Sequence, residues 1–226
     1  MVFQGIKGIA FDLDGTLLDS APDLGAAINV MLTDLGAEPV CDQLSRQWVG
    51  NGMPKLVQRA MAHAKLCSST YEQAFTLFTD AYAADSSSRS RLYEGVAPAL
   101  AELHKQGMAM ALITNKAARF LPSLLADFDL ADYFSIVLGG DTLQEKKPHP
   151  LPLLHVCQQW QIKPSELLMV GDSKNDVQAG QAAGAQTLGL TYGYNYGEHI
   201  ALSNPDQVAD NLIELAQQLA STNQHV

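Results

Sequence analysis

The sequence predicts an α/β protein: a doubly wound, parallel-sheet (Rossmann-like) core with an inserted α-helical cap domain. Two observations support this. From about residue 92 onward, short apolar runs alternate with helical segments, which is typical of a parallel sheet covered on both faces. Before that point, the apolar run Gly8–Phe11 is followed by a long stretch with helical periodicity alone. We therefore expect an α/β core from residues 1–18 and 92–226 and a helical cap from residues 19–91.

The first strand, Gly8–Phe11, should end at the turn that Gly15 permits. Ser20 has Asp23 three residues later, which is a helix-start signature. This helix should run to about Gly36, because glycine adopts the left-handed conformation that ends many helices.

Helical periodicity continues to about Ala84, and the serine-rich segment Ser86–Arg91 is a candidate linker. Beyond it, apolar runs and helical segments alternate to the end of the chain. The expected strands are 108–113, 135–138, 167–170 and 186–190, and the expected helices are 117–127, 151–160, 175–183 and 212–219.

Composition narrows the possible functions. The 226 residues are 47% hydrophobic and 17% charged, which suits a compact protein and argues against disorder. The net charge of -10, with no Lys/Arg cluster, would repel a polyanion, so we expect no nucleic-acid partner. No apolar run reaches the roughly 18 residues that span a bilayer, so we expect no membrane partner and no signal peptide. The three cysteines (Cys41, Cys67, Cys157) form neither a disulfide framework nor a zinc motif. We expect buried thiols in a cytoplasmic protein.

Polar residues follow several of the expected strands, where ligands bind in open parallel sheets. These residues are Asp12 and Asp14, then Thr114–Lys116, then Lys146–Pro148, and finally Gly171–Ser173 with Asp176 one turn later. Each group also has a purely structural interpretation, as a turn, a helix start or a solvated charge pair. Their coincidence at successive strand ends favours a functional site.

The carboxylates in this set suggest a metal. Asp12 and Asp14 are two residues apart, so on an extended chain they face the same side. Neighbouring carboxylates repel each other unless a cation lies between them or one is protonated. Asp172 would add a third acidic group, which makes an oxygen-ligated cation such as Mg²⁺ the expected solution.

Four ordered segments resemble the motifs of the haloacid dehalogenase-like phosphatases, and the resemblance spans nearly the whole chain. The segments are Phe11–Ser20, Leu112–Asn115, Lys147–Pro150 and Gly171–Asp176. Within that family, three further segments resemble the bacterial phosphoglycolate phosphatases: Trp48–Gly52, Gly139–Asp141 and Gly189–Gly197. Leu151 departs from this subgroup, which often has an acidic residue there, and Glu94 stands where a proline is common.

The resemblance implies a Mg²⁺-dependent hydrolase of a small phosphorylated metabolite, with 2-phosphoglycolate as the leading substrate. Asp12 would be the nucleophile that forms an aspartyl-phosphate, and Asp14 the general acid and base. Thr114 and Asn115 would bind the phosphoryl oxygens. Lys147, rather than Lys146, would neutralise the charge of the transferring group.

The same resemblance implies a metal site made by Asp12, the main-chain carbonyl of Asp14, and Asp172, with Asp176 in support. Gly50, Asn51 and Gly52 form the candidate loop through which the cap contacts the substrate, because glycines allow close backbone approach. An ordinary turn between helices is the alternative. We interpret Tyr192–Tyr196 as a surface loop that its glycine permits.

Other functions stay open at this point. One alternative is a phosphatase of broad range on small metabolites, and another is a sugar phosphomutase, which would pass the phosphoryl group to a second hydroxyl. A regulatory module with a decayed site is a third, and the intact set of Asp12, Asp14, Thr114, Lys147 and Asp172 argues against it. The oligomeric state, monomer or dimer, is also open.

Overall fold

The computed structural model describes residues 3–223. The strands are β1 (Gly8–Phe11), β2 (Leu18–Asp19), β3 (Arg91–Leu92), β4 (Ala109–Ile113), β5 (Ile136–Leu138), β6 (Leu167–Gly171), β7 (Gln186–Leu190) and β8 (Gln207–Ala209). The α-helices are α1 (Ala21–Asp34), α2 (Asp42–Arg46), α3 (Met53–His63), α4 (Tyr71–Ala84), α5 (Val96–Lys105), α6 (Leu121–Asp127), α7 (Leu151–Trp160), α8 (Lys174–Ala183) and α9 (Leu212–Asn223). Short 3-10 helices cover Ser68–Thr70, Ala118–Phe120, Ala131–Tyr133, Pro164–Glu166, Asn195–Gly197 and Ile200–Ser203.

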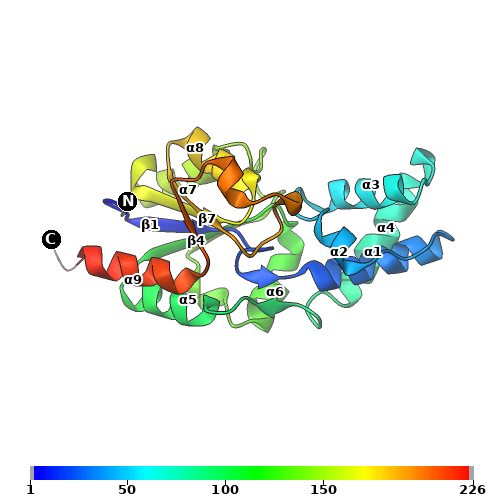
Figure 1. The fold of residues 1–226 in the computed structure, drawn as a ribbon, viewed down its shortest axis with the longest axis horizontal. Coiled ribbons are helices and arrows are strands. Elements are labelled where there is room, and N and C mark those ends of the chain that lie inside the picture. Colours follow the sequence, from blue (N-terminus) through cyan, green and yellow to red (C-terminus); the bar gives the residue numbers. More distant parts are fainter. Residues whose placement is uncertain (1–2, 224–226) are drawn as a thin grey trace.

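A six-stranded parallel sheet forms the centre of the larger part of the molecule, in the order β5-β4-β1-β6-β7-β8 (Figure 1). Its central strands are continuous apolar runs because both faces are buried. Along β1, Phe11 belongs to one hydrophobic cluster and Ala10 to the other, as the alternation of side chains requires. The predicted α/β fold class is confirmed.

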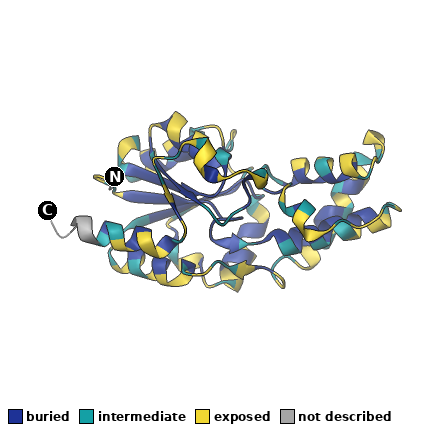
Figure 2. Cartoon of the chain, viewed as in Figure 1, coloured by how far each residue is buried: buried dark blue, intermediate teal, exposed yellow. Residues whose placement is uncertain are grey.

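Helices cover both faces of this sheet, with α5, α6 and α9 on one side and α7 and α8 on the other (Figure 1). Figure 2 shows the strands buried between these two layers. Because β1 lies between β4 and β6, the carboxyl ends of these three strands meet at one edge. That edge faces the second group of helices.

This second group is α1–α4, which lies beside the sheet edge (Figure 1). The antiparallel pair of β2 and β3 connects it to the core, with Leu18 opposite Leu92. Helix α1 starts directly after Ser20 and ends at Asp34, and Gly36 follows with a φ of +73°. The helix start and the glycine were both predicted.

The Ser20 side chain makes no capping bond to α1, however. Asp23 is fully buried and accepts hydrogen bonds from the backbone N–H groups of Arg89 and Ser90 and from the Ser90 hydroxyl. The helix-start signature is therefore correct as to position, but its two polar residues bind elsewhere. Asp23 fastens the serine-rich segment to α1.

Several elements were not predicted. Helix α5, the edge strand β8 and the pair of β2 and β3 are absent from the expected pattern. The expectation of three buried thiols was wrong for two of them: Cys157 is buried, whereas Cys41 and Cys67 are exposed. Both exposed cysteines directly precede short helices, α2 and a 3-10 turn, at the surface. Within residues 3–223, no helix is long and apolar enough to cross a membrane.

Candidate active site

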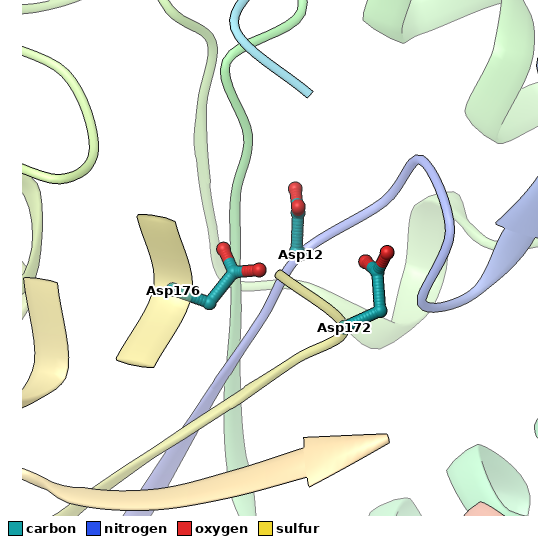
Figure 3. Close-up of side chains that lie close together, drawn as sticks. All are labelled: Asp12, Asp172 and Asp176. Atoms are coloured by element: carbon teal, nitrogen blue, oxygen red, sulfur yellow. The ribbon is translucent and has the colours of Figure 1, made fainter. Parts of the chain in front are cut away.

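Three carboxylates meet at the sheet edge. Asp12 directly follows β1, Asp172 directly follows β6, and Asp176 lies in the first turn of α8. One oxygen from each lies within 4.8 Å of the others, and Figure 3 shows the three side chains close together. All three residues are buried. The parallel sheet thus brings residues 160 positions apart in sequence into one cluster, as the strand ends predicted.

The electrostatics of this cluster favour a cation. Burial raises the pKa of Asp12 well above its ordinary value, and Asp176 and Asp172 raise it further against the opposing effect of Lys147. Burial, together with the charge of Asp176, raises the pKa of Asp172 to about 7. A hard divalent cation would relieve this repulsion, and carboxylate oxygens are its preferred ligands. The donor set therefore fits such an ion.

Lys147 is the cation that the structure brings to this cluster. Its Nζ lies 3.0 Å from Asp12 Oδ1 and 2.6 Å from Asp176 Oδ1, and its side chain is buried. Burial alone would lower the pKa of Lys147, but Asp12 and Asp176 outweigh burial and raise it. Lys146 instead reaches the cap, where its Nζ donates to the Asn51 carbonyl. The sequence interpretation had preferred Lys147 for the same place.

Asp176 serves the helix and the site together. Its Oδ2 accepts from the backbone N–H and the hydroxyl of Ser173, which caps α8. Its Oδ1 pairs with Lys147. The helix-start interpretation is thus confirmed, and because Asp176 uses a different oxygen for each contact, it leaves Oδ1 facing the carboxylate cluster, where a role at the metal stays a prediction.

Asp14 lies at the same edge but points to different partners. Its Oδ1 accepts from the Ser20 hydroxyl at 2.5 Å, and Lys116 Nζ lies 3.1 Å from the same oxygen. Gly15, with a φ of +91°, turns the chain there, and a Cβ on it would lie 2.3 Å from Asp172 Oδ2. Only glycine accepts both the conformation and this close approach. The turn therefore holds Asp14 beside the carboxylate cluster.

Thr114 and Asn115 follow β4 and are buried. The Asn115 amide donates to the Gly50 carbonyl and to the Lys147 carbonyl, both at 3.0 Å. Both of its N–H groups are thus engaged in holding the cap loop and the segment that carries Lys147. Thr114 accepts a hydrogen bond from the Lys116 backbone N–H at 3.2 Å, and its hydroxyl keeps its own proton for donation.

The cap loop Gly50–Gly52 lies over the strand ends. The Gly50 carbonyl accepts from Asn115 and also from Asn175 at 3.1 Å. Gly50 and Gly52 line the pocket that contains Asp12 and Asp14, whereas Asn51 faces an outer pocket and accepts from Arg59 at 2.6 Å. Of the three predicted contact residues, the structure places the two glycines in the inner pocket. The loop thus contacts residues at the strand ends, and its contact with a substrate stays a prediction.

The inner pocket is small. It leaves about 20 Å³ for the centres of water molecules, which is space for one or two waters. Its lining joins polar residues of the core to an apolar wall from the cap. The lining residues are Asp12, Asp14, Leu24, Val49, Gly50, Gly52, Met53, Leu56, Thr114, Asn115 and Lys116.

The interpretation of Tyr192–Tyr196 as a surface loop was wrong. The Tyr194 backbone N–H donates to Asp172 Oδ2 at 2.7 Å, and the Tyr192 hydroxyl donates to the Thr16 carbonyl at 2.8 Å. The Tyr194 hydroxyl also donates to Asp19 of β2 at 2.8 Å. The loop thus packs against Asp172, a candidate metal ligand, and against the strand that connects the core to the cap. Gly193 makes this close approach to Asp172 possible.

Three residues contribute to the site although the sequence interpretation gave them no role there. Lys116 pairs with Asp14, Thr16 Oγ1 donates to Asp172 Oδ1 at 2.8 Å, and Asn175 holds Gly50. Lys116 and Asn175 belong to strand-end segments that were noted, so their position was a usable signal. The partner of Thr16 lies 156 residues away, and nothing local in the sequence indicates it.

Comparison with known proteins agrees with the four motifs. A family model described as haloacid dehalogenase-like hydrolase matches residues 9–190. A phosphoglycolate phosphatase of Vibrio parahaemolyticus is 48% identical over 97% of this chain and 99% of the relative. A phosphoglycolate phosphatase of Psychrobacter arcticus is 46% identical over 93% of this chain and 94% of the relative.

Solved structures agree as well. The crystal structure of a protein described as a predicted phosphoglycolate phosphatase from Haemophilus somnus superposes with a TM-score of 0.92 at 38% identity. The match covers 95% of this chain and 98% of that one. Because the family model spans most of the chain and these relatives match almost all of it, the chain belongs to the haloacid dehalogenase-like hydrolase family.

Proposed function

We propose that this protein is a Mg²⁺-dependent phosphatase that hydrolyses 2-phosphoglycolate to glycolate and phosphate. The observation that carries the reaction class is the buried Asp12 carboxylate, with Lys147 Nζ 3.0 Å away and two further carboxylates beside it. The relatives described as phosphoglycolate phosphatases, at 46% to 48% identity over nearly the whole chain, supply the substrate.

Asp12 acts as the nucleophile. Its Oδ1 accepts from the Leu13 backbone N–H at 2.7 Å and pairs with Lys147, so Oδ2 is the oxygen left for attack on phosphorus. Attack forms the Asp12 acyl–phosphate bond and breaks the bond between phosphorus and the ester oxygen. Lys147 offsets the negative charge of the transferring group, without which a carboxylate and a phosphate dianion would repel.

Asp14 moves the protons in both halves of the reaction. It donates a proton to the leaving ester oxygen and then takes one from the water that attacks the aspartyl-phosphate. Release of phosphate regenerates the Asp12 carboxylate. Mg²⁺ bound by Asp12, Asp172 and the Asp14 carbonyl, with Asp176 in support, would offset charge on the phosphoryl oxygens.

The remaining residues position the substrate. The Thr114 hydroxyl binds a phosphoryl oxygen, while Asn115 holds Lys147 and the cap loop by the two hydrogen bonds of its amide. Residues 19–91 act as a cap that opens to admit the substrate and closes to exclude water. With the cap in its present position the inner pocket has space for only one or two waters, so the cap must open for a substrate to enter. We also place the protein in the cytoplasm, which its free thiols support.

A panel of phosphomonoesters assayed with Mg²⁺ and ranked by kcat/KM tests this function. We expect 2-phosphoglycolate to rank first, with glycolate and phosphate as products. A hexose phosphate belongs in the panel, because a phosphomutase would return an isomeric sugar phosphate instead of free phosphate. A different ester ranked at least about tenfold higher would contradict the substrate, and phosphate release that persists in excess chelator would contradict the metal.

A further inference from the structure

Lys116 has no part in the mechanism proposed above, yet it is one of the most enclosed cations of the described chain. It lies two residues beyond Thr114 at the end of β4, and only 2% of its side chain is exposed. Its Nζ lies 3.1 Å from Asp14 Oδ1, 3.2 Å from Asp14 Oδ2 and 4.8 Å from the centre of the Tyr82 ring. Burying a lysine ammonium costs free energy unless the charge is paired, so its surroundings are informative.

The surroundings keep Lys116 charged. The Asp14 carboxylate, 3.1 Å from Nζ, and the face of the Tyr82 ring both favour the ammonium form of Lys116. The ammonium carries three N–H donors, and a single carboxylate does not require all of them. Lys116 is therefore a permanent cation with capacity for a second acidic partner.

Lys116 is also the one cationic side chain among the described residues that line the inner pocket. The opposite wall comes from the cap and is apolar where Leu24, Val49 and Met53 line it. An acidic group of a ligand enclosed there would lose its water and find no other partner of opposite charge on the pocket wall. Such a loss is costly unless an ion pair replaces the water.

The geometry of the proposed reaction places the substrate carboxylate in this part of the pocket. Asp14 must touch the ester oxygen in order to protonate it, and Lys116 Nζ touches Asp14. In 2-phosphoglycolate a single carbon joins the ester oxygen to the carboxylate. A cation beside Asp14 is therefore within reach of the carboxylate, whereas Lys147 lies on the phosphoryl side with Asp12.

We propose that Lys116 recognises the substrate carboxylate and selects phosphomonoesters that carry an acidic group on the carbon next to the ester oxygen. This inference rests on the proposed function. In the free protein the Asp14 carboxylate and the Tyr82 ring hold the lysine in place. In the complex the ammonium contacts the carboxylates of Asp14 and the substrate together.

The test compares kcat/KM for 2-phosphoglycolate with kcat/KM for ethyl phosphate, in which a methyl group replaces the carboxylate. Lys116→Met should lower this ratio by roughly 10- to 100-fold, the effect of losing a charge-assisted hydrogen bond. Any effect of the substitution through Asp14 acts on both substrates and cancels in the ratio. Lys116→Arg, which keeps the charge, should retain more of the ratio than Lys116→Met does.

Lys55→Met is the matched control. Lys55 is an exposed lysine of α3 that lines only the outer pocket, so its removal should leave the ratio within about twofold. A parent enzyme that prefers 2-phosphoglycolate, together with a Lys116→Met variant that keeps the ratio, would overturn the inference and leave the proposed function intact. A parent enzyme without that preference would overturn both.

A binding measurement covers the case in which Lys116→Met turns over neither ester. In an Asp12→Asn background with Mg²⁺, calorimetry gives Kd for 2-phosphoglycolate and for ethyl phosphate. Adding Lys116→Met should weaken binding of 2-phosphoglycolate by at least about tenfold relative to ethyl phosphate. Equal weakening of both ligands would show a merely structural lysine and would overturn the inference.

Discussion

Replacing Gly193 with alanine should displace Asp172 and weaken the metal site. A Cβ on residue 193 would lie 2.1 Å from the Asp172 Cβ, where ordinary contact begins at 3.4 Å. The obstacle lies next to the backbone of Asp172, so rotation of a flexible side-chain end cannot relieve it. One of the two segments must move by about 1 Å.

The expected magnitude follows from the hydrogen bonds that such a shift breaks. Asp172 accepts from Thr16 Oγ1 at 2.8 Å and from the Tyr194 backbone N–H at 2.7 Å. A hydrogen bond to a charged group contributes about 1.5 kcal/mol or more, so Gly193→Ala should lower the free energy of unfolding by about 3 kcal/mol. Loss of groups that orient a ligand should raise the Mg²⁺ concentration for half-maximal activity at least about tenfold.

Urea unfolding and Mg²⁺ titration of phosphate release measure the two effects. Gly197→Ala is the control, because it lies in the same loop, and a Cβ there meets nothing within 4 Å. Its φ of +82° should still cost about 1 kcal/mol of stability, with an unchanged Mg²⁺ requirement. Our account of this loop is refuted if Gly193→Ala needs no more Mg²⁺ than the parent and unfolds at the same urea concentration.

Two further predictions concern charge burial. The pKa of Asp172 is raised to about 7 from its usual value of 3.8. Between these two pH values the metal-free folded state therefore binds more protons than the unfolded state does. The free energy of unfolding in excess chelator should therefore fall by about 4 kcal/mol as pH rises from about 4 to 7. Asp172→Asn should flatten this dependence. A free energy of unfolding that rises with pH over this range would contradict the prediction. Asp23→Ala leaves the buried backbone N–H of Ser90 without an acceptor, so it should lower the free energy of unfolding in urea by about 3 kcal/mol. The control Asp85→Ala, at an exposed residue, should lower it by less than about 0.5 kcal/mol. Equal costs for these two variants would show that Asp23 does not fasten the linker.

The strand ends were predictable because of a simple physical constraint. Buried parallel strands are continuous apolar runs, and the residue after each run must emerge at the same edge of the sheet. That reasoning brought Asp12, Thr114 and Asp172 together from sequence alone, and the structure places them there. The same constraint explains why Lys147 could be preferred to Lys146 only by resemblance, since adjacent residues share the position.

Other parts of the site depend on partners distant in sequence. Asp23 looks like part of a local helix start, but it accepts from the backbone N–H of Ser90, which lies 67 residues away. Lys116 pairs with Asp14 across 102 residues. Tyr194 contacts Asp172 with its backbone N–H, so the type of its side chain does not indicate the contact. No periodicity encodes such contacts.

Short elements escaped prediction for a different reason. The strands β2 and β3 have two residues each, which is too few for alternation to register. The exposure of the Cys41 and Cys67 thiols was missed for another reason. A general preference of cysteine for burial does not apply to a residue that starts a surface helix.

The central claim is that Asp12 carries the phosphoryl group during turnover. Acid quench of the parent protein during the first turnover of 2-phosphoglycolate labelled in its phosphate, followed by peptide mapping, tests it directly. We predict label on the peptide that contains Asp12, and none in a folded Asp12→Asn variant, which should also lose turnover. Label on another residue, or near-parent turnover by Asp12→Asn, would contradict the account.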